Sequence, residues 1–181
     1  NVAADALFTA AYTGVAGGTV VVSADDPGMA SSQNEQDNRR YALAAGVPML
    51  EPSDAQEAYE FTRLGFELSE RFQLPVLLRL TTRVCHSQTR VAAGPGLPAR
   101  PVERYERDIP GRVMVPAYAR PAHRRLRGKL DDVRQWNEAE GPTELIEGDR
   151  ALGIVTSGVS YMHVLEAAPD ASVLKLGLAH P

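Results

Sequence analysis

The apolar positions of this chain follow two different periods, and the two periods predict alternating helices and strands. Short apolar runs predict strands at 19–23, where most residues are β-branched, at 49–50 and at 76–80. Apolar residues at helical spacing predict helices at 2–13, at about 34–45 and from 53 to about 72. Because connections of helix length join successive strands, this order predicts an open, right-handed, mostly parallel α/β sheet.

Local signals set the ends of these elements. Gly46 is expected to close the second helix as a C-cap. Ser53 and Gln56 are spaced as a capping box for the third helix. The strand at 76–80 is apolar throughout except for Arg79, which is typical of a parallel sheet covered on both faces.

The pattern weakens between residues 86 and 150. Seven of the 13 prolines lie there, and only 119–138 has helical spacing. Since 65 residues are too many for an ordinary loop, we expect a structured crossover. A strand at 152–156, a helix at about 160–167 and a strand at 172–176 then follow.

The expected organisation has three parts. We predict part of one α/β domain at 1–85, the interdomain crossover at 86–150 and the start of a second α/β domain at 151–181. The first residues have the pattern of the middle of a helix, and the last residues have that of a strand end. We therefore expect a fragment of a longer protein.

Composition narrows the class of protein. The 181 residues are 44% hydrophobic and 23% charged, which is enough to bury a core. A formal charge of -4 argues against a nucleic-acid partner. No apolar run approaches the roughly 18 residues of a membrane span. The single cysteine excludes an internal disulfide and fits a cytoplasmic location.

The candidate chemistry lies in the polar stretch 23–40, directly after the first strand. Strand C-termini are where open α/β sheets build ligand sites. No catalytic residue and no metal ligand can be assigned in this stretch. The residues that we predict to line a cofactor or substrate pocket are Asp25, Asp26, Ser31, Ser32, Gln33, Asn34 and Arg39.

Each of these residues has a second interpretation. Asp25 and Asp26 could bind Mg²⁺, but a turn set by the following Pro-Gly is favoured. The Ser-Ser-Gln-Asn run at 31–34 could bind a ligand, cap the next helix, or do both. Arg39 could meet a carboxylate or belong to a solvated helix face.

Several segments resemble one enzyme family, in that family's order. The stretches at 23–40, 49–54, 75–84, 113–120 and 152–158 are similar to the α subunits of indolepyruvate:ferredoxin oxidoreductases. This family belongs to the thiamine-diphosphate-dependent 2-oxoacid:ferredoxin oxidoreductases. The resemblance implies the fold of a thiamine-diphosphate pyrimidine-binding domain, an open, mostly parallel α/β sheet flanked by helices.

The resemblance also implies an activity for the whole protein. It would oxidatively decarboxylate indolepyruvate and other aryl 2-oxoacids with coenzyme A, using thiamine diphosphate with Mg²⁺ and [4Fe–4S] clusters. It would work as an oligomer with a β subunit and pass electrons to ferredoxin. None of these cofactors is expected in this chain alone, since a [4Fe–4S] cluster needs four cysteines. The chain alone is therefore predicted to be inactive.

One departure from the family pattern affects the site. Related enzymes place an arginine just after the equivalent strand to hold the substrate carboxylate, whereas this sequence has Asp25-Asp26. Arg39 is therefore only a candidate for that role.

A non-enzymatic alternative remains open. Asp25-Asp26, Glu51 and Thr81-Thr82 each follow a predicted strand, as in a flavodoxin-like or phospho-receiver-like binding module. The long polar loop after the acidic pair argues against this interpretation.

Overall fold

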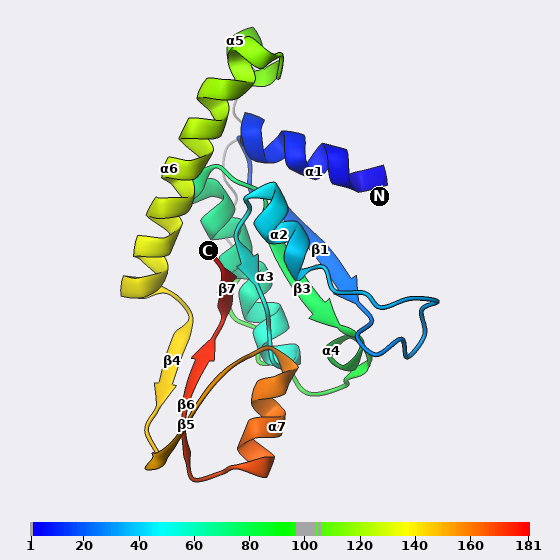
Figure 1. Cartoon of the computed structure of the whole chain (residues 1–181), viewed down its shortest axis with the longest axis vertical. Coiled ribbons are helices and arrows are strands. Elements are labelled where there is room, and N and C mark those ends of the chain that lie inside the picture. Colours follow the sequence, from blue (N-terminus) through cyan, green and yellow to red (C-terminus); the bar gives the residue numbers. More distant parts are fainter. Residues whose placement is uncertain (1, 97–103, 105) are drawn as a thin grey trace.

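The computed structural model describes residues 2–96, 104 and 106–181, and its strands form two sheets (Figure 1). The first sheet has the strand order β1-β3-β2-β7, and the second has the order β4-β6-β5. The helices are α1 Val2–Thr13, α2 Arg39–Ala45, α3 Ala55–Phe72, α4 Thr82–His86, α5 Ile109–Arg112, α6 Pro116–Glu140 and α7 Val159–Ala167. The strands are β1 Val20–Asp25, β2 Met49–Leu50, β3 Val76–Thr81, β4 Thr143–Ile146, β5 Asp149–Ser157, β6 Ala171–Leu176 and β7 Leu178–His180.

The central strand β3 organises the core of the first sheet. It pairs in parallel with β1 on one side and with β2 on the other. Successive residues of a strand point to opposite faces. Val76 and Leu78 accordingly pack in a cluster with Phe61 of α3, whereas Leu77 packs in a second cluster with Ala42 of α2. The predicted parallel sheet flanked by helices is confirmed.

Helix α3 covers one face of this sheet and is capped differently from the prediction. Asp54, and not Ser53, is the N-cap, and its carboxylate accepts a hydrogen bond from the Glu57 amide at 2.8 Å. The carboxylate of Glu57 accepts in turn from the amide and the hydroxyl of Ser53. The predicted Ser53–Gln56 box is therefore wrong by one residue, because Asp54 and Glu57 form the equivalent pair.

Helix α2 starts later than predicted. We expected it to begin at about residue 34, but it begins at Arg39 and 34–38 remain in the preceding loop. The Asn38 amide donates to the Asp25 carboxylate at 2.7 Å, which fixes the backbone ahead of the helix. The predicted end is confirmed, since Gly46 lies in the left-handed region with φ 71°.

The long helix α6 contains the predicted helix at 119–138 and extends it at both ends. Its Leu126 joins the cluster on the α2 face, and its Trp136 joins the cluster that contains Phe61. Three elements of this region were not predicted, namely the short helices α4 and α5 and the strand β4. All three are only four or five residues long, too short for a clear apolar period. Part of the expected crossover, 97–103 and 105, lies outside the described residues.

The second sheet contains the predicted strand, helix and strand as β5, α7 and β6, with β5 and β6 parallel. β4 adds to β6 in the antiparallel direction. The strand β7 then returns to the first sheet and pairs with β2, where Met49 lies opposite His180. The domain boundaries at 85 and 150 remain a prediction. No helix in the described part of the chain is long and apolar enough to cross a membrane.

Replacing two of the glycines by alanine should change the stability of the fold in opposite directions. Gly46 has φ 71°, and an added Cβ would lie 3.2 Å from Leu126. Gly128 lies within α6, and an added Cβ would have no atom within 4 Å. We expect Gly46→Ala to lower the free energy of unfolding by about 1–2 kcal/mol and Gly128→Ala to raise it by up to about 1 kcal/mol. Chemical denaturation measures both, and shifts of the same sign would contradict this assignment.

Candidate functional site

Charged side chains gather where the three parallel strands end. Asp25 ends β1, Glu51 directly follows β2, and Arg79 lies near the end of β3. The Arg79 Nε donates to Asp25 Oδ2 at 2.7 Å, and its Nη1 donates to Glu51 Oε1. Its Nη2 lies 3.9 Å from Asp37 Oδ1. The side chains of Asp25, Glu51 and Arg79 are at most 6% exposed, so this is a buried ionic cluster.

The loop at 26–38 begins at Asp26, which holds its first turns. One oxygen of Asp26 accepts from the amides of Ser31 and Ser32, both at 2.6 Å, and the other accepts from the Thr82 hydroxyl at 2.7 Å. These bonds, led by the one from Thr82, lower the pKa of Asp26 to about 2. The favoured turn is present, because the Met29 amide donates to the Asp26 carbonyl.

The far end of the same loop is held by the other aspartate of the pair. Asp25 Oδ2 accepts from the amide of Asn38, whose side-chain Nδ2 donates to the Ser23 hydroxyl at 2.7 Å. The loop is therefore tied to the sheet edge at both ends by adjacent carboxylates, each through backbone amides.

Arg39 is paired with a residue of the loop itself. Its Nε and Nη2 donate to the two carboxylate oxygens of Asp37, at 2.8 and 2.9 Å. The hydrogen bonds from Arg39 lower the pKa of Asp37 to about 2, and the same contact raises the pKa of Arg39. A carboxylate of this chain therefore occupies one edge of the Arg39 guanidinium.

Two cavities border the loop and share Asp37. The larger, about 530 Å³, lies against α1 and β1. Its apolar side includes Leu7, Val22 and Tyr41, and its polar side includes Asn34. The second, about 460 Å³, lies between α2 and the second sheet and is lined by Asp37, Arg39, Arg40, Leu43, Met49, Glu51, Ser157, Leu176, Ala179 and His180.

The predicted pocket residues thus occupy different positions. Asp25 and Asp26 are buried at the sheet edge, and Ser31 and Ser32 offer them their amides. Asn34 lines the larger cavity and Arg39 the smaller one, while Gln33 is exposed on the loop. Whether these residues contact a ligand stays a prediction.

The sequence analysis did not assign Arg79 or Asp37 to the site, and it used Glu51 and Thr82 only in the alternative interpretation. Arg79 carried a signal, because a charge in an otherwise apolar, buried strand requires a partner. In the described residues, no group of three or more His, Cys, Asp or Glu is placed to hold a metal ion.

A second ionic contact joins the second sheet to helix α3. Lys175, in β6, donates to Glu57 of α3, and its Nζ lies 4.5 Å from the centre of the Tyr161 ring. Burial raises the pKa of Glu57, but hydrogen bonds from Lys175 and Ser53 outweigh burial and leave this pKa lowered. For Lys175, burial lowers the pKa, but the contact with Glu57 outweighs it and leaves this pKa raised.

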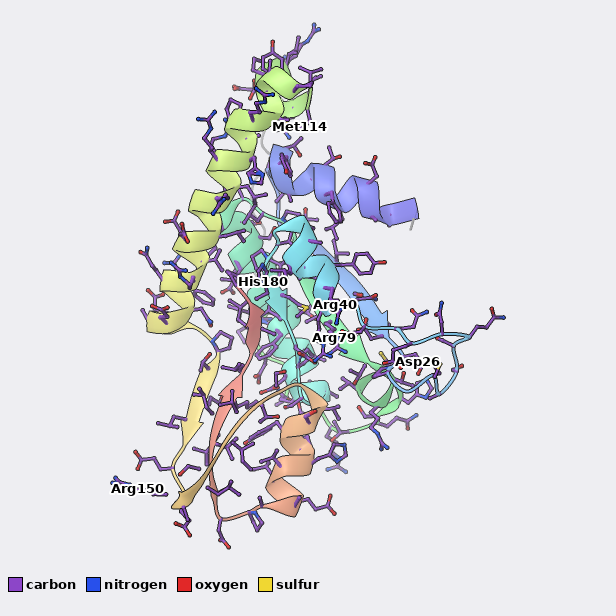
Figure 2. All side chains as sticks on the ribbon, viewed as in Figure 1. Asp26, Arg40, Arg79, Met114, Arg150 and His180 are labelled. Atoms are coloured by element: carbon purple, nitrogen blue, oxygen red, sulfur yellow. The ribbon has the colours of Figure 1, made fainter. Side chains whose placement is uncertain are left out.

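The fold is shared with a solved enzyme. The 2-oxoglutarate:ferredoxin oxidoreductase from Magnetococcus marinus superimposes on 99% of this chain and 40% of its own chain, with a TM-score of 0.65 at 17% identity. Figure 2 shows Asp26, Arg40 and Arg79 in the part of the molecule where the strands of this fold end. The chain therefore has the α/β fold of a segment of a 2-oxoacid:ferredoxin oxidoreductase.

The sequence comparison is more specific. Subunit IorA of indolepyruvate oxidoreductase is 47% identical in Methanothermobacter thermautotrophicus, 43% in Archaeoglobus fulgidus and 43% in Thermococcus kodakarensis. Each match covers this whole chain and 30% of the relative. No protein-family model matches the chain. The predicted resemblance is confirmed, and the chain corresponds to one segment of these subunits, spanning about 30% of their length.

The lowered pKa of Asp26 predicts a pH dependence of stability. Its ordinary value of 3.8 falls to about 2 in the folded chain, so the ionised form stabilises the fold above about pH 4. This contribution is lost as the pH falls through about 2. We expect Asp26→Asn to be less stable than the unaltered protein at pH 7, with a difference that shrinks between pH 4 and pH 2.

Denaturant midpoints measured across this pH range test the prediction. Asp132→Asn is the control, because Asp132 is exposed on α6 and forms no hydrogen bond or ion pair with any described residue. A stability difference for Asp26→Asn that stays constant down to pH 2 would contradict the assigned cause.

Proposed function

We propose that this chain is part of an oxidoreductase subunit that oxidatively decarboxylates indolepyruvate and other aryl 2-oxoacids to acyl-CoA. The protein would act with a second subunit and pass electrons to ferredoxin in the cytoplasm. The observation that carries this proposal is the match of the entire chain, at 39–47% identity, to subunit IorA of six archaeal indolepyruvate oxidoreductases. The binding-module alternative is not favoured, because none of these relatives is a signalling protein.

The edge of the first sheet at which its parallel strands end supports the same proposal. Both cavities are lined by residues that follow these strands, and each combines apolar and polar lining residues. An aryl 2-oxoacid needs both kinds of surface, since its ring is apolar and its oxoacid end is charged.

Thiamine diphosphate supplies the electron sink that 2-oxoacid decarboxylation needs, and the resemblance implies it for the whole protein. The acidic pair at the end of β1 does not fit its Mg²⁺–diphosphate end. Asp25 is bonded to Arg79 and Asn38, and Asp26 to Thr82 and two loop amides. We therefore assign to this chain only the holding of substrate and of the loop.

The proposal is tested with the complete protein and its companion subunit. Indolepyruvate, with coenzyme A, should drive the reduction of ferredoxin, and 2-oxoglutarate should do so with a much lower kcat/KM. Comparable use of both acids, or no turnover of either, would overturn the proposed substrate class. The isolated 181-residue chain should show no turnover, and sustained activity from it would overturn its assignment as a part of the enzyme.

Two adjacent arginines offer a test of how the substrate is held. Both line the cavity between α2 and the second sheet. Arg39 is bound to Asp37, whereas Arg40 is exposed and forms no hydrogen bond or ion pair with a described residue. We propose that Arg40 meets the substrate carboxylate.

Arg40→Gln in the complete enzyme should raise the KM for indolepyruvate about tenfold, because a hydrogen bond to a charged group contributes about 1.5–3 kcal/mol. Arg39→Gln is the matched control and should change KM less. A larger KM effect from Arg39→Gln would assign the carboxylate to Arg39 instead.

A further inference from the structure

A continuous series of hydrogen bonds runs from the second sheet to the loop at 26–38. At the turn between β5 and α7, the Ser157 hydroxyl donates to Glu51 Oε2 at 3.0 Å. The other oxygen of Glu51 accepts from Arg79, whose Nε donates to Asp25 Oδ2. The same oxygen of Asp25 accepts from the Asn38 amide at the end of the loop.

The positions of the residues in this series are restricted because its charged members are buried. A buried charge that loses its partner is costly, so Arg79, Glu51 and Asp25 must keep their relative positions. The backbone of the second sheet also takes part. Gly158 has φ 55°, and a Cβ added there would lie 2.7 Å from Glu51 Oε1. The turn before α7 therefore packs directly on the Glu51 carboxylate.

The loop end that this series reaches borders both cavities, because Asp37 lines the smaller cavity with Arg40 as well as the larger one. The cavity of about 530 Å³ is bordered by five consecutive loop residues, 34–38. Asn38 closes this run, and its amide depends on Asp25. The two amides at the start of the loop depend instead on Asp26, which is bonded to Thr82 and not to Arg79. Residues 34–38 are therefore the part of the loop that Arg79 can influence through Asp25.

We propose that Arg79 is a positioning residue. Through the contacts of Glu51, Arg79 and Asp25, the position of the second sheet determines the position of residues 34–38 of the pocket loop. The Nε and Nη1 of Arg79 donate to carboxylates of this chain, and its Nη2 lies 3.9 Å from Asp37 Oδ1, so it acts on residues 34–38 both through Asp25 and directly through Asp37. The kinetic part of the inference rests on the proposed function, whereas the structural part does not.

Hydrogen–deuterium exchange of the complete enzyme, without substrate, tests the structural part. Ser157→Ala removes the hydrogen bond from the second sheet to Glu51 and leaves every charged group in place. We expect the Asn38 amide, which donates to Asp25, to exchange about fivefold faster, the effect of losing roughly one hydrogen bond. Ser160→Ala is the matched control, since Ser160 is exposed on α7 and forms no hydrogen bond with a described residue.

Arg79→Lys tests the centre of the series. Lysine keeps the charge but lacks the planar fork that reaches two carboxylates at once. It should accelerate exchange of the Asn38 amide more than Ser157→Ala does. Arg71→Gln, which removes an exposed ion pair with Glu140, should leave the exchange of this amide unchanged. Unchanged exchange of the Asn38 amide in both Ser157→Ala and Arg79→Lys would overturn the proposal.

Steady-state kinetics separate positioning from simple destabilisation. A displaced loop weakens substrate binding, so Ser157→Ala should raise the KM for indolepyruvate about fivefold with little change in kcat. A destabilised enzyme would instead lose active molecules, with a lower apparent kcat and an unchanged KM. That second result would overturn the positioning role. If the unaltered enzyme does not oxidise indolepyruvate, the proposed function fails, and the exchange data still decide the structural inference.

Discussion

The burial of one guanidinium, that of Arg79, is the constraint on which the rest of this site depends. Arg79 lies in the central strand of the first sheet, where its side chain is 4% exposed. Removing an arginine from water costs several kcal/mol unless carboxylates replace its hydration. Asp25 and Glu51, at the ends of the two flanking strands, provide that replacement. These ion pairs hold the three strand ends in one arrangement. They add to the alignment that the backbone hydrogen bonds between the strands provide.

Charge also holds the second sheet in place, where apolar packing contributes little. Helix α7 has no buried residue among those described, and Leu152 and Val155 of β5 are more than half exposed. Among the described residues, the side-chain hydrogen bonds that join the second sheet to the first sheet and to α3 are those of Ser157 with Glu51 and of Lys175 with Glu57. Polar contacts of this kind need exact partners, so they fix an orientation more sharply than an apolar surface does. The antiparallel pairing of β7 with β2 adds a backbone connection to the same region.

Much of the fold could be predicted from the sequence, because period and glycine placement are local signals. Apolar runs marked β1 and β3, and Gly46 marked the end of α2. The start of α2 could not be predicted in the same way. It depends on the amide of Asn38 meeting Asp25, which lies 13 residues earlier. The short strand β4 was missed for a similar reason, since its partner β6 lies about 30 residues later in the chain.

The site was harder to predict, because its residues meet only through the register of the sheet. The sequence showed Arg79 as an exception within an apolar strand, but its partners lie 54 and 28 residues earlier. The parallel register that places Asp25 opposite Thr81 also brings Asp25 within reach of Arg79. Choosing Asp25 and Glu51 from among 23 acidic residues would require this register in advance.

The two adjacent aspartates illustrate how sequence neighbours acquire separate functions. A shared Mg²⁺ site was one interpretation of the pair, since both carboxylates follow the same strand. Consecutive residues of an extended chain point in opposite directions. Asp25 accordingly turns inward to Arg79, and Asp26 turns to Thr82 and the loop amides. One aspartate therefore joins the loop to the buried ionic cluster, and the other shapes its first turn. This division gives the two carboxylates after β1 separate tasks: Asp25 pairs with the cation buried in β3, and both carboxylates hold the loop.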